Sequence, residues 1–219
     1  MPRPPLARER VMDAYESILI DEGDRAATLD AVARAAGVSK GGLLYHFASK
    51  DELAAGLVAR LEALTDDDLL RMQASPEGPV AYYVRTSVME DDALDRALIA
   101  TSRLAQGGSV VATAGLREVR HRWAEAIRPH VRDDAALDLV MLLSDGLYFN
   151  NSLAFDPAHP EDADGFVPSG DGLDRLIRLV TRLTTQAPED PKPASSDDGQ
   201  PLRPRRSRSD GTDRRRWPR

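Results

Sequence analysis

The chain has 219 residues, of which 42% are apolar and 5% aromatic, so its core must consist mainly of Leu, Val, Ala and Ile. It contains no cysteine, which excludes disulfides, thiolate catalysis and cysteine-ligated metal centres in this chain. No apolar run reaches the roughly 18 residues of a membrane span, and no signal peptide is visible. We therefore expect a cytoplasmic protein that does not enter the membrane.

The net charge of −7 is distributed unevenly. Residues 1–60 carry 8 basic and 9 acidic side chains, residues 61–186 carry 12 and 21, and residues 187–219 carry 9 and 6. The acidity therefore lies in the middle of the chain. Affinity for phosphate depends on where individual cations lie, so the overall negative charge does not exclude DNA binding by the N-terminal segment.

The N-terminal segment is predicted to form three helices. Apolar residues recur at helical spacing up to Gly23, which is a natural helix stop. Thr28 is expected to cap a short second helix that ends at Gly37. Ser39 is expected to cap a third helix that runs to about Phe47.

Longer helices are expected in the rest of the chain. Ser49 to Glu52 has the pattern of a capping box and opens a fourth helix that continues to about Met72. Further helical patterns follow at about residues 80–88, 92–104, 116–127, 134–155 and 172–185. Because neither a repeat nor an alternating strand pattern is visible, the sequence predicts an all-α fold. After residue 187 the composition predicts a disordered tail.

The second and third helices have the pattern of a helix-turn-helix. Gly37 permits the left-handed turn, Val38 fills the angle between the helices, and Ser39 begins the second one. Leu43 and Phe47 lie four residues apart and are expected to face the core. Two successive glycines cost the helix about 1 kcal/mol each relative to alanine, which is reasonable if the helix must approach a phosphate or groove wall closely. The residues left facing outward are Lys40, Gly41, Leu44, Tyr45 and His46.

This stretch resembles a known family. TLDAVARAAG followed by VSKGGLLYHFASKDEL is similar to the DNA-binding domain of TetR-type (tetracycline-repressor-like) regulators over residues 8–60. Beyond residue 60 the resemblance rests on length, the all-α pattern and two final apolar helices. It implies that the third helix reads DNA. The residues that it implies as DNA contacts are Thr28, Ser39, Lys40, Gly41, Tyr45, His46 and Lys50. Leu44, where many relatives carry tyrosine or another polar residue, is expected to contact DNA through apolar atoms, for example a thymine methyl.

The resemblance also implies an N-terminal three-helix helix-turn-helix domain and a C-terminal helical domain that binds an effector and dimerises. We assign residues 1–48 to the first, residues 49–186 to the second, and residues 187–219 to the tail. Pairing of the helices at 134–155 and 172–185 would form a homodimer that binds a palindromic operator in double-stranded DNA. An unknown small-molecule effector would shift the helix that starts at Lys50 and release the DNA, as expected of a repressor. The basic tail is either a solvated segment or a weak, nonspecific aid to DNA binding.

The effector site is the least specified part of the prediction. Its candidate residues combine aromatic and apolar walls with a few polar groups. An alternative for most of them is simple core packing. Polar residues at 144, 145, 150 and 151 interrupt an apolar helix and serve either a ligand or a dimer interface. The candidates are Tyr82, Trp123, Met141, Asp145, Tyr148 and Asn150.

The sequence contains few features that indicate other classes of function. His121, His130 and His159 have no metal-ligand spacing, so we expect no metal site. Neither a nucleophile elbow nor a Walker A loop is present, so we expect neither catalysis nor a cofactor. Two alternatives remain: an enzyme tethered to DNA by its helix-turn-helix, and an architectural DNA-binding protein without a ligand.

Overall fold

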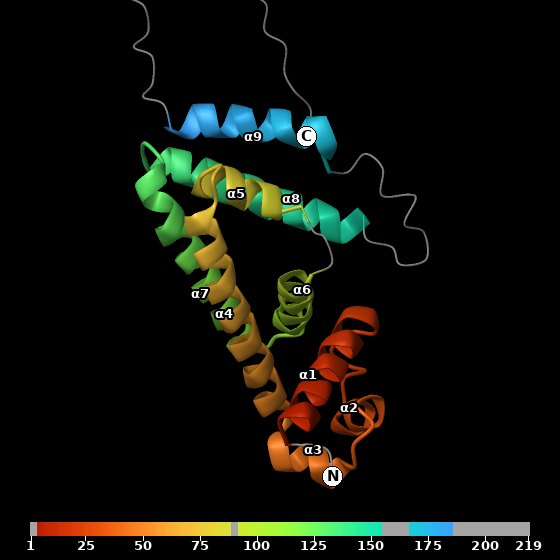
Figure 1. The fold of residues 1–219 in the computed structure, drawn as a ribbon. Helices are drawn as coiled ribbons and strands as arrows, with labels where there is room; N and C mark the ends of the chain where they lie inside the picture. Colours follow the sequence, from red (N-terminus) through yellow and green to blue (C-terminus); the bar gives the residue numbers. More distant parts are fainter. Residues whose placement is uncertain (1–3, 89–91, 155–166, 186–219) are drawn as a thin grey trace, which may run out of the picture. The chain divides into compact units, whose positions relative to one another are not determined.

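The computed structural model describes residues 4–88, 92–154 and 167–185, and these residues are helical apart from short connections. The predicted disordered tail, residues 187–219, lies outside them. The elements are α1 (Pro4–Asp21), α2 (Leu29–Ala35), α3 (Lys40–His46), α4 (Lys50–Ala74), α5 (Pro79–Thr86), α6 (Ala93–Gln106), α7 (Val110–Ile127), the 3-10 helix η1 (Arg128–His130), α8 (Asp134–Ala154) and α9 (Gly170–Thr185) (Figure 1). The all-α prediction is confirmed.

The predicted caps at Thr28, Ser39 and Ser49 form, but the carboxylate of Glu52 accepts from the backbone N–H of Ala48 at 2.8 Å and so does not close the predicted capping box on Ser49. The hydroxyls of Thr28 and Ser39 accept hydrogen bonds from the backbone N–H groups of Ala31 at 3.2 Å and Gly42 at 3.0 Å. Between these helices Gly37 adopts a φ of +64°, the left-handed conformation that favours glycine. These local interactions fix where α2 ends and where α3 begins.

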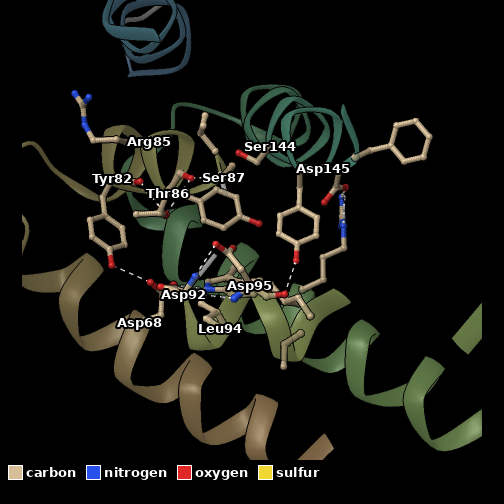
Figure 2. A pocket seen from close by; sticks show the side chains of 18 of the residues that line it. Asp68, Tyr82, Arg85, Thr86, Ser87, Asp92, Leu94, Asp95, Ser144 and Asp145 are labelled. Atoms are coloured by element: carbon tan, nitrogen blue, oxygen red, sulfur yellow. Dashed lines mark hydrogen bonds and ion pairs between the residues drawn. The ribbon is translucent and has the colours of Figure 1, made fainter. Parts of the chain in front are cut away.

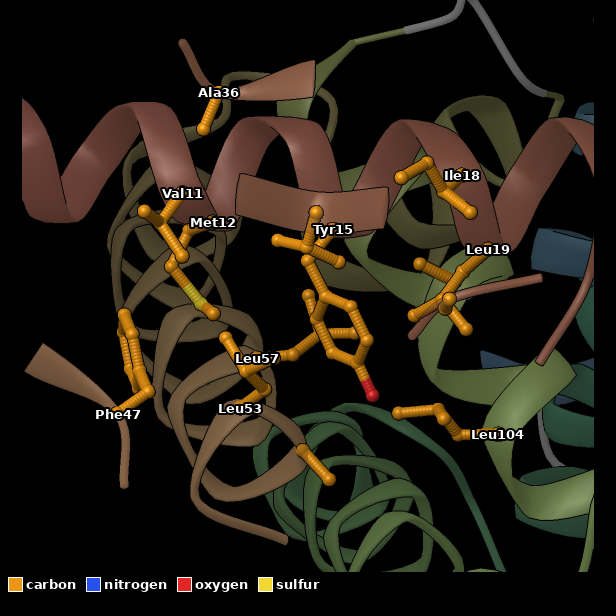
Figure 3. Packing of buried hydrophobic residues seen from close by; sticks show 14 of the residues in the cluster. Val11, Met12, Tyr15, Ile18, Leu19, Ala36, Phe47, Leu53, Leu57 and Leu104 are labelled. Carbon is orange, nitrogen blue, oxygen red and sulfur yellow. The ribbon is translucent and has the colours of Figure 1, made fainter. Parts of the chain in front are cut away.

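Residues from distant parts of the chain form the core around the helix-turn-helix (Figure 3). Tyr15 and Leu19 of α1 pack there with Leu57 of α4. Ala100 and Leu104, both on α6, complete the same cluster. We call α1–α3 the head and α5–α9 the body, with α4 joining them. Because α6 contributes to the head core, the head does not pack on its own helices alone.

A second cluster of buried residues forms the core of the body. It includes Leu61 and Met72 of α4, Trp123 of α7, Val140 of α8 and Ile177 of α9. Helix α9 packs along α8 and α5 (Figure 1). No helix in the described ranges is long and apolar enough to cross a membrane.

A buried carboxylate joins three helices where the head meets the body. Glu16 of α1 is 6% exposed at its side chain. It accepts hydrogen bonds from Arg60 of α4 at 3.3 Å and from Arg96 of α6 at 3.1 Å. Arg60 also bonds the exposed carboxylates of Glu9 at 2.9 Å and Asp13 at 2.7 Å. The position of α1 is therefore tied electrostatically to α4 and α6.

Candidate nucleic-acid interface and candidate ligand cavity

Helix α3 presents one buried and one exposed face. Leu43 and Phe47 are buried in the head core, as their spacing predicts. Tyr45 is 82% exposed, and its ring meets that of His46 edge-on at 5.1 Å between centroids. A large aromatic side chain this exposed on a short helix has no packing role in the isolated chain, and its hydroxyl is free to donate to a phosphate.

The glycine at position 41 leaves open space on this face. A Cβ atom added there would meet nothing within 4 Å. Packing inside the protein therefore does not explain Gly41. The absent side chain lets the first turn of α3 approach an external surface closely.

The predicted cationic contacts already have partners within the head. Lys40 lies 3.1 Å from Asp30, and both side chains are more than half exposed. Exposed ion pairs of this kind contribute little to stability, so Lys40 can exchange its partner for a phosphate at small cost. Lys50 is held more firmly: its ammonium donates to the backbone oxygen of Asp24 at 2.7 Å and lies 2.8 Å from the Asp24 carboxylate. Lys50 thus ties the start of α4 to the turn before α2, a role that the sequence did not predict.

Thr28, Ser39 and Leu44 are also exposed, while His46 and Lys50 are half-buried. Two further arginines, which were not predicted from the sequence, lie beside and on α2. Arg25 precedes α2 and Arg34 lies in its last turn, and both are exposed without an ion-pair partner among the described residues. Exposed cations next to a helix-turn-helix are of the kind that contacts phosphates in DNA complexes, so their position in the sequence was enough to name them as candidates.

The body contains a cavity of about 380 Å³ (Figure 2). That volume lies within the usual range of small-molecule sites, roughly 300–1,000 Å³. Aromatic rings supply much of the wall, and α4, α5, α6, α7 and α8 all contribute to it. The aromatic residues are Tyr82, Tyr83, Trp123, Tyr148 and Phe149. The cavity is therefore bounded by five helices, and aromatic rings form much of its wall.

A carboxylate on α4 lies at one wall of this cavity. Asp68 is 4% exposed and accepts hydrogen bonds from the Tyr82 hydroxyl at 2.8 Å and the Trp123 indole Nε1 at 2.9 Å. Burial, followed by the hydrogen bond to Asp68, raises the pKa of Tyr82 above its usual value near 10. Asp68 was not among the residues predicted from the sequence. Its spacing from Leu61 and Thr65, seven and three residues, continues the buried stripe of α4 and would have identified it.

Four of the six predicted effector residues line the cavity: Tyr82, Trp123, Asp145 and Tyr148. The other two are placed elsewhere. Met141 is buried in the body core, and the side-chain amide of Asn150 donates to the backbone oxygen of Gly146 within its own helix at 2.7 Å. Asp145 accepts a hydrogen bond from Arg120 at 2.8 Å. The hydroxyl of Tyr148 donates to the backbone oxygen of Asp95 at 3.0 Å, and burial raises the pKa of this tyrosine. Polar interruptions on α8 thus serve both the cavity and the helix itself.

Helix α6 connects the cavity with the head. Asp95 and Leu98 line the cavity, whereas Arg96 bonds Glu16 of α1, and Leu104 lies in the head core. Asp92 caps this helix and closes a reciprocal capping box with Asp95. A displacement of α6 would therefore act on α1 through these direct contacts, and not only through α4. No cluster of His, Asp or Glu able to hold a metal ion occurs in the part of the chain that the structure describes.

Two family models match the chain. The model of bacterial regulatory proteins of the tetR family covers residues 11–57, and that of the tetracyclin repressor-like C-terminal domain covers residues 77–169. The HTH-type transcriptional regulator BetI of Rhizobium meliloti (strain 1021) is 32% identical over 90 residues, 40% of this chain and 44% of that protein. The uncharacterized HTH-type transcriptional regulator TtgW of Pseudomonas putida is 38% identical over 52 residues, 24% of this chain and 39% of that protein. The chain therefore spans less than half the length of either relative.

Solved structures resemble the chain over most of its length. GusR of Salmonella enterica has a TM-score of 0.58 and 19% identity, with 84% of this chain and 97% of that chain covered. A transcriptional regulator of Rhodococcus sp. Rha1 has a TM-score of 0.57 and 22% identity, with 83% and 99% covered. At these identities the likeness concerns the fold. The matches to the two family models, one over the N-terminal and one over the C-terminal part, place the chain in the tetR family of bacterial regulatory proteins.

Proposed function

We propose that the protein is a transcriptional repressor that binds a palindromic operator as a homodimer and is released by a small molecule. The observation that carries this proposal is the exposed face of α3, where Tyr45 projects beside the open space at Gly41 above a fully buried opposite face. This face lies within the segment that matches the tetR-family model. We propose that α3 enters the major groove, and that the first turns of α2, α3 and α4 offer phosphates the backbone N–H groups that their cap side chains do not accept from. Such a regulator acts where the chromosome is, in the cytoplasm.

Dimerisation through α8 and α9 is supported by the apolar residues that these helices expose. Leu142 is 65% exposed and Phe149 60% exposed, and Leu139, Leu179 and Leu183 are each more than 40% exposed. Clustered exposed apolar side chains mark association surfaces in soluble proteins. Two-fold pairing of α8 and α9 would bury them in a four-helix interface and set the two α3 helices for successive half-sites.

The cavity supports the effector part of the proposal and disfavours an architectural protein without a ligand. We propose that a ligand held between α5, α6 and α8 displaces α6 and, through Glu16 and the shared head core, α1. The transmission expected from the sequence passes through α4 alone, and the contacts of α6 add a second route. A tenfold loss of DNA affinity requires a coupling of only about 1.4 kcal/mol, within the usual range. We propose no catalytic step for the body.

Selection from a random duplex pool with the full chain tests the DNA-binding part. The proposal expects an inverted repeat with half-sites about one or more helical turns apart. Recovery of fragments without a shared sequence would contradict a sequence-specific regulator.

Sedimentation of two matched variants tests the dimer. Leu142 of α8 and Leu70 of α4 are both 65% exposed, so replacing either with Asp adds the same charge to a similarly exposed site. Leu142→Asp should produce a monomer with weakened affinity for the selected repeat, because its charge would be buried in the interface. Leu70→Asp should remain a dimer. A dimer in both cases would refute pairing through α8.

A further inference from the structure

The cavity contains a buried negative charge without a cationic partner. The two hydrogen bonds that Asp68 accepts come from neutral donors, the Tyr82 hydroxyl and the Trp123 indole. No Lys, Arg or His nitrogen among the described residues lies within ion-pair distance of Asp68. Burying a carboxylate costs free energy that hydrogen bonds offset only in part, and an opposite charge supplies the remainder.

The arginines that line the cavity are directed elsewhere. Arg120 pairs with Asp145 at 2.8 Å. Arg85 pairs with Glu77 at 3.0 Å and Asp174 at 2.9 Å, and Figure 2 shows it pointing away from Asp68. Arg71 lines the cavity but is exposed. Two of the three guanidinium groups already have carboxylate partners, and the charge of the third, Arg71, is exposed to solvent, which screens it. The buried carboxylate of Asp68 is screened less, so the cavity favours a cation near Asp68 more than an anion.

The remaining lining fits the body of an organic cation. The faces of Trp and Tyr rings attract a positive charge, most strongly where water is excluded. Tyr82 and Trp123 both touch Asp68, so aromatic rings and the carboxylate meet at one place. Asp92 and Asp95 bring two more carboxylates to the cavity, on the same side as Asp68 in Figure 2.

A second polar position lies on α8. Ser144 lines the cavity and is 2% exposed, and its hydroxyl has no hydrogen-bond partner within the described ranges. Buried hydroxyls are normally satisfied, so an unpartnered one that faces a cavity points to a missing ligand group. It would receive a polar substituent of the ligand at a point separate from the charge.

We propose that this cavity selects an organic monocation, an amine or quaternary ammonium with a compact apolar or aromatic body, whose charge lies against Asp68. This inference rests on the proposed role of the cavity as the effector site and names the chemical class of the effector. It predicts that, among ligands of similar size and shape, the cavity binds a cation more tightly than a neutral molecule or an anion.

Three probes of similar size test that selectivity without DNA. Benzyltrimethylammonium carries a permanent positive charge, neopentylbenzene replaces its nitrogen with carbon, and benzylsulfonate is an anion. Binding to the full chain is measured by calorimetry and by quenching of tryptophan fluorescence. The cation should bind at least tenfold more tightly than the neutral probe, and the anion more weakly than both. Equal affinities, or a preference for the anion, would overturn the proposal.

Two isosteric variants test whether the carboxylate of Asp68 causes the preference for a cation. Asp68→Asn should bring the cation-to-neutral affinity ratio close to one while neutral binding stays within threefold. Asp67→Asn, the same substitution at the adjacent exposed position, should leave the ratio unchanged. Loss of the ratio in both variants, or in neither, would remove Asp68 from the proposal. If Asp68→Asn does not fold, Asp68→Glu, which keeps the charge, must retain the preference, and its loss would overturn the assignment.

The effect of the cation on DNA binding is measured separately. The wild-type chain is first bound to its selected repeat, and the cation is then added. Release of DNA supports the effector role. If the cation binds but DNA affinity stays unchanged, the effector role is refuted while the charge selectivity stands. If none of the three probes binds to a chain that still binds its repeat, the monocation assignment is overturned while DNA binding stands.

Discussion

Replacing Glu16 with glutamine tests whether α6 is coupled to the head. The buried carboxylate bonds Arg60 and Arg96, and breaking a fully buried ion pair costs about 3–5 kcal/mol. The cost here should be smaller for two reasons. Arg60 keeps its bonds to Glu9 and Asp13, and Arg96 is one-third exposed at its side chain. The amide oxygen of glutamine also retains one acceptor. We therefore expect the free energy of unfolding to fall by about 2 kcal/mol.

The control is Asp13→Asn, which removes a charge from the same cluster where the side chain is 63% exposed. Its effect should stay below about 0.5 kcal/mol, because exposed ion pairs contribute little. Both variants are unfolded in urea at one protein concentration, since the stability of the proposed dimer would depend on concentration. Equal losses of unfolding free energy in the two variants would refute the coupling of α1 to α4 and α6 through Glu16. Hydrogen exchange should also show faster opening of α1 in Glu16→Gln and not in Asp13→Asn.

Lys50→Ala separates the two roles available to that residue. If Lys50 contacts a phosphate, the salt dependence of DNA affinity falls by about one unit; lower stability with an unchanged salt slope would assign it only to the bond with Asp24. Stability should also decrease at alkaline pH. The pKa of Tyr148 is raised by burial, so its contribution is complete below about pH 10, the pKa of an unfolded tyrosine, and is lost as pH rises further. In Tyr148→Phe the decline should be shallower by up to about 1.4 kcal/mol per pH unit in urea titrations at pH 9 to 11, and an identical slope would contradict the assignment.

Local signals account for what the sequence predicted well. The caps at Thr28 and Ser39, the left-handed glycine at 37 and the buried pair Leu43 and Phe47 all depend on residues within a few positions of one another. Such interactions can be inferred from spacing alone. The same holds for the boundaries of α8 and α9, which differ from the predicted ones by one or two residues.

Contacts between distant residues account for what was missed. Leu104 completes the core around Tyr15, some 90 positions away, and no periodicity signals that pairing. Asp24 lies 26 residues before Lys50, so the sequence offered Lys50 only as a phosphate contact. Asp68 follows two other aspartates, at 66 and 67, and was not predicted as a cavity residue. Its burial depends on Trp123, which α7 brings to it from 55 residues away.

The central claim is that α3 meets DNA at its glycine-bearing first turn, and Gly41→Leu tests it most directly. The space around a Cβ atom at 41 is open, so the free protein should tolerate the change, while a bulky side chain would hold the helix away from the groove. Ala63→Leu, at an exposed position of α4, is the matched control. Affinity for the selected repeat is measured by fluorescence anisotropy at one salt concentration, with the melting temperature of each variant measured alongside. Gly41→Leu should bind at least tenfold more weakly, about 1.4 kcal/mol, with its melting temperature unchanged and Ala63→Leu unaffected. Full affinity in a folded Gly41→Leu protein would contradict the account.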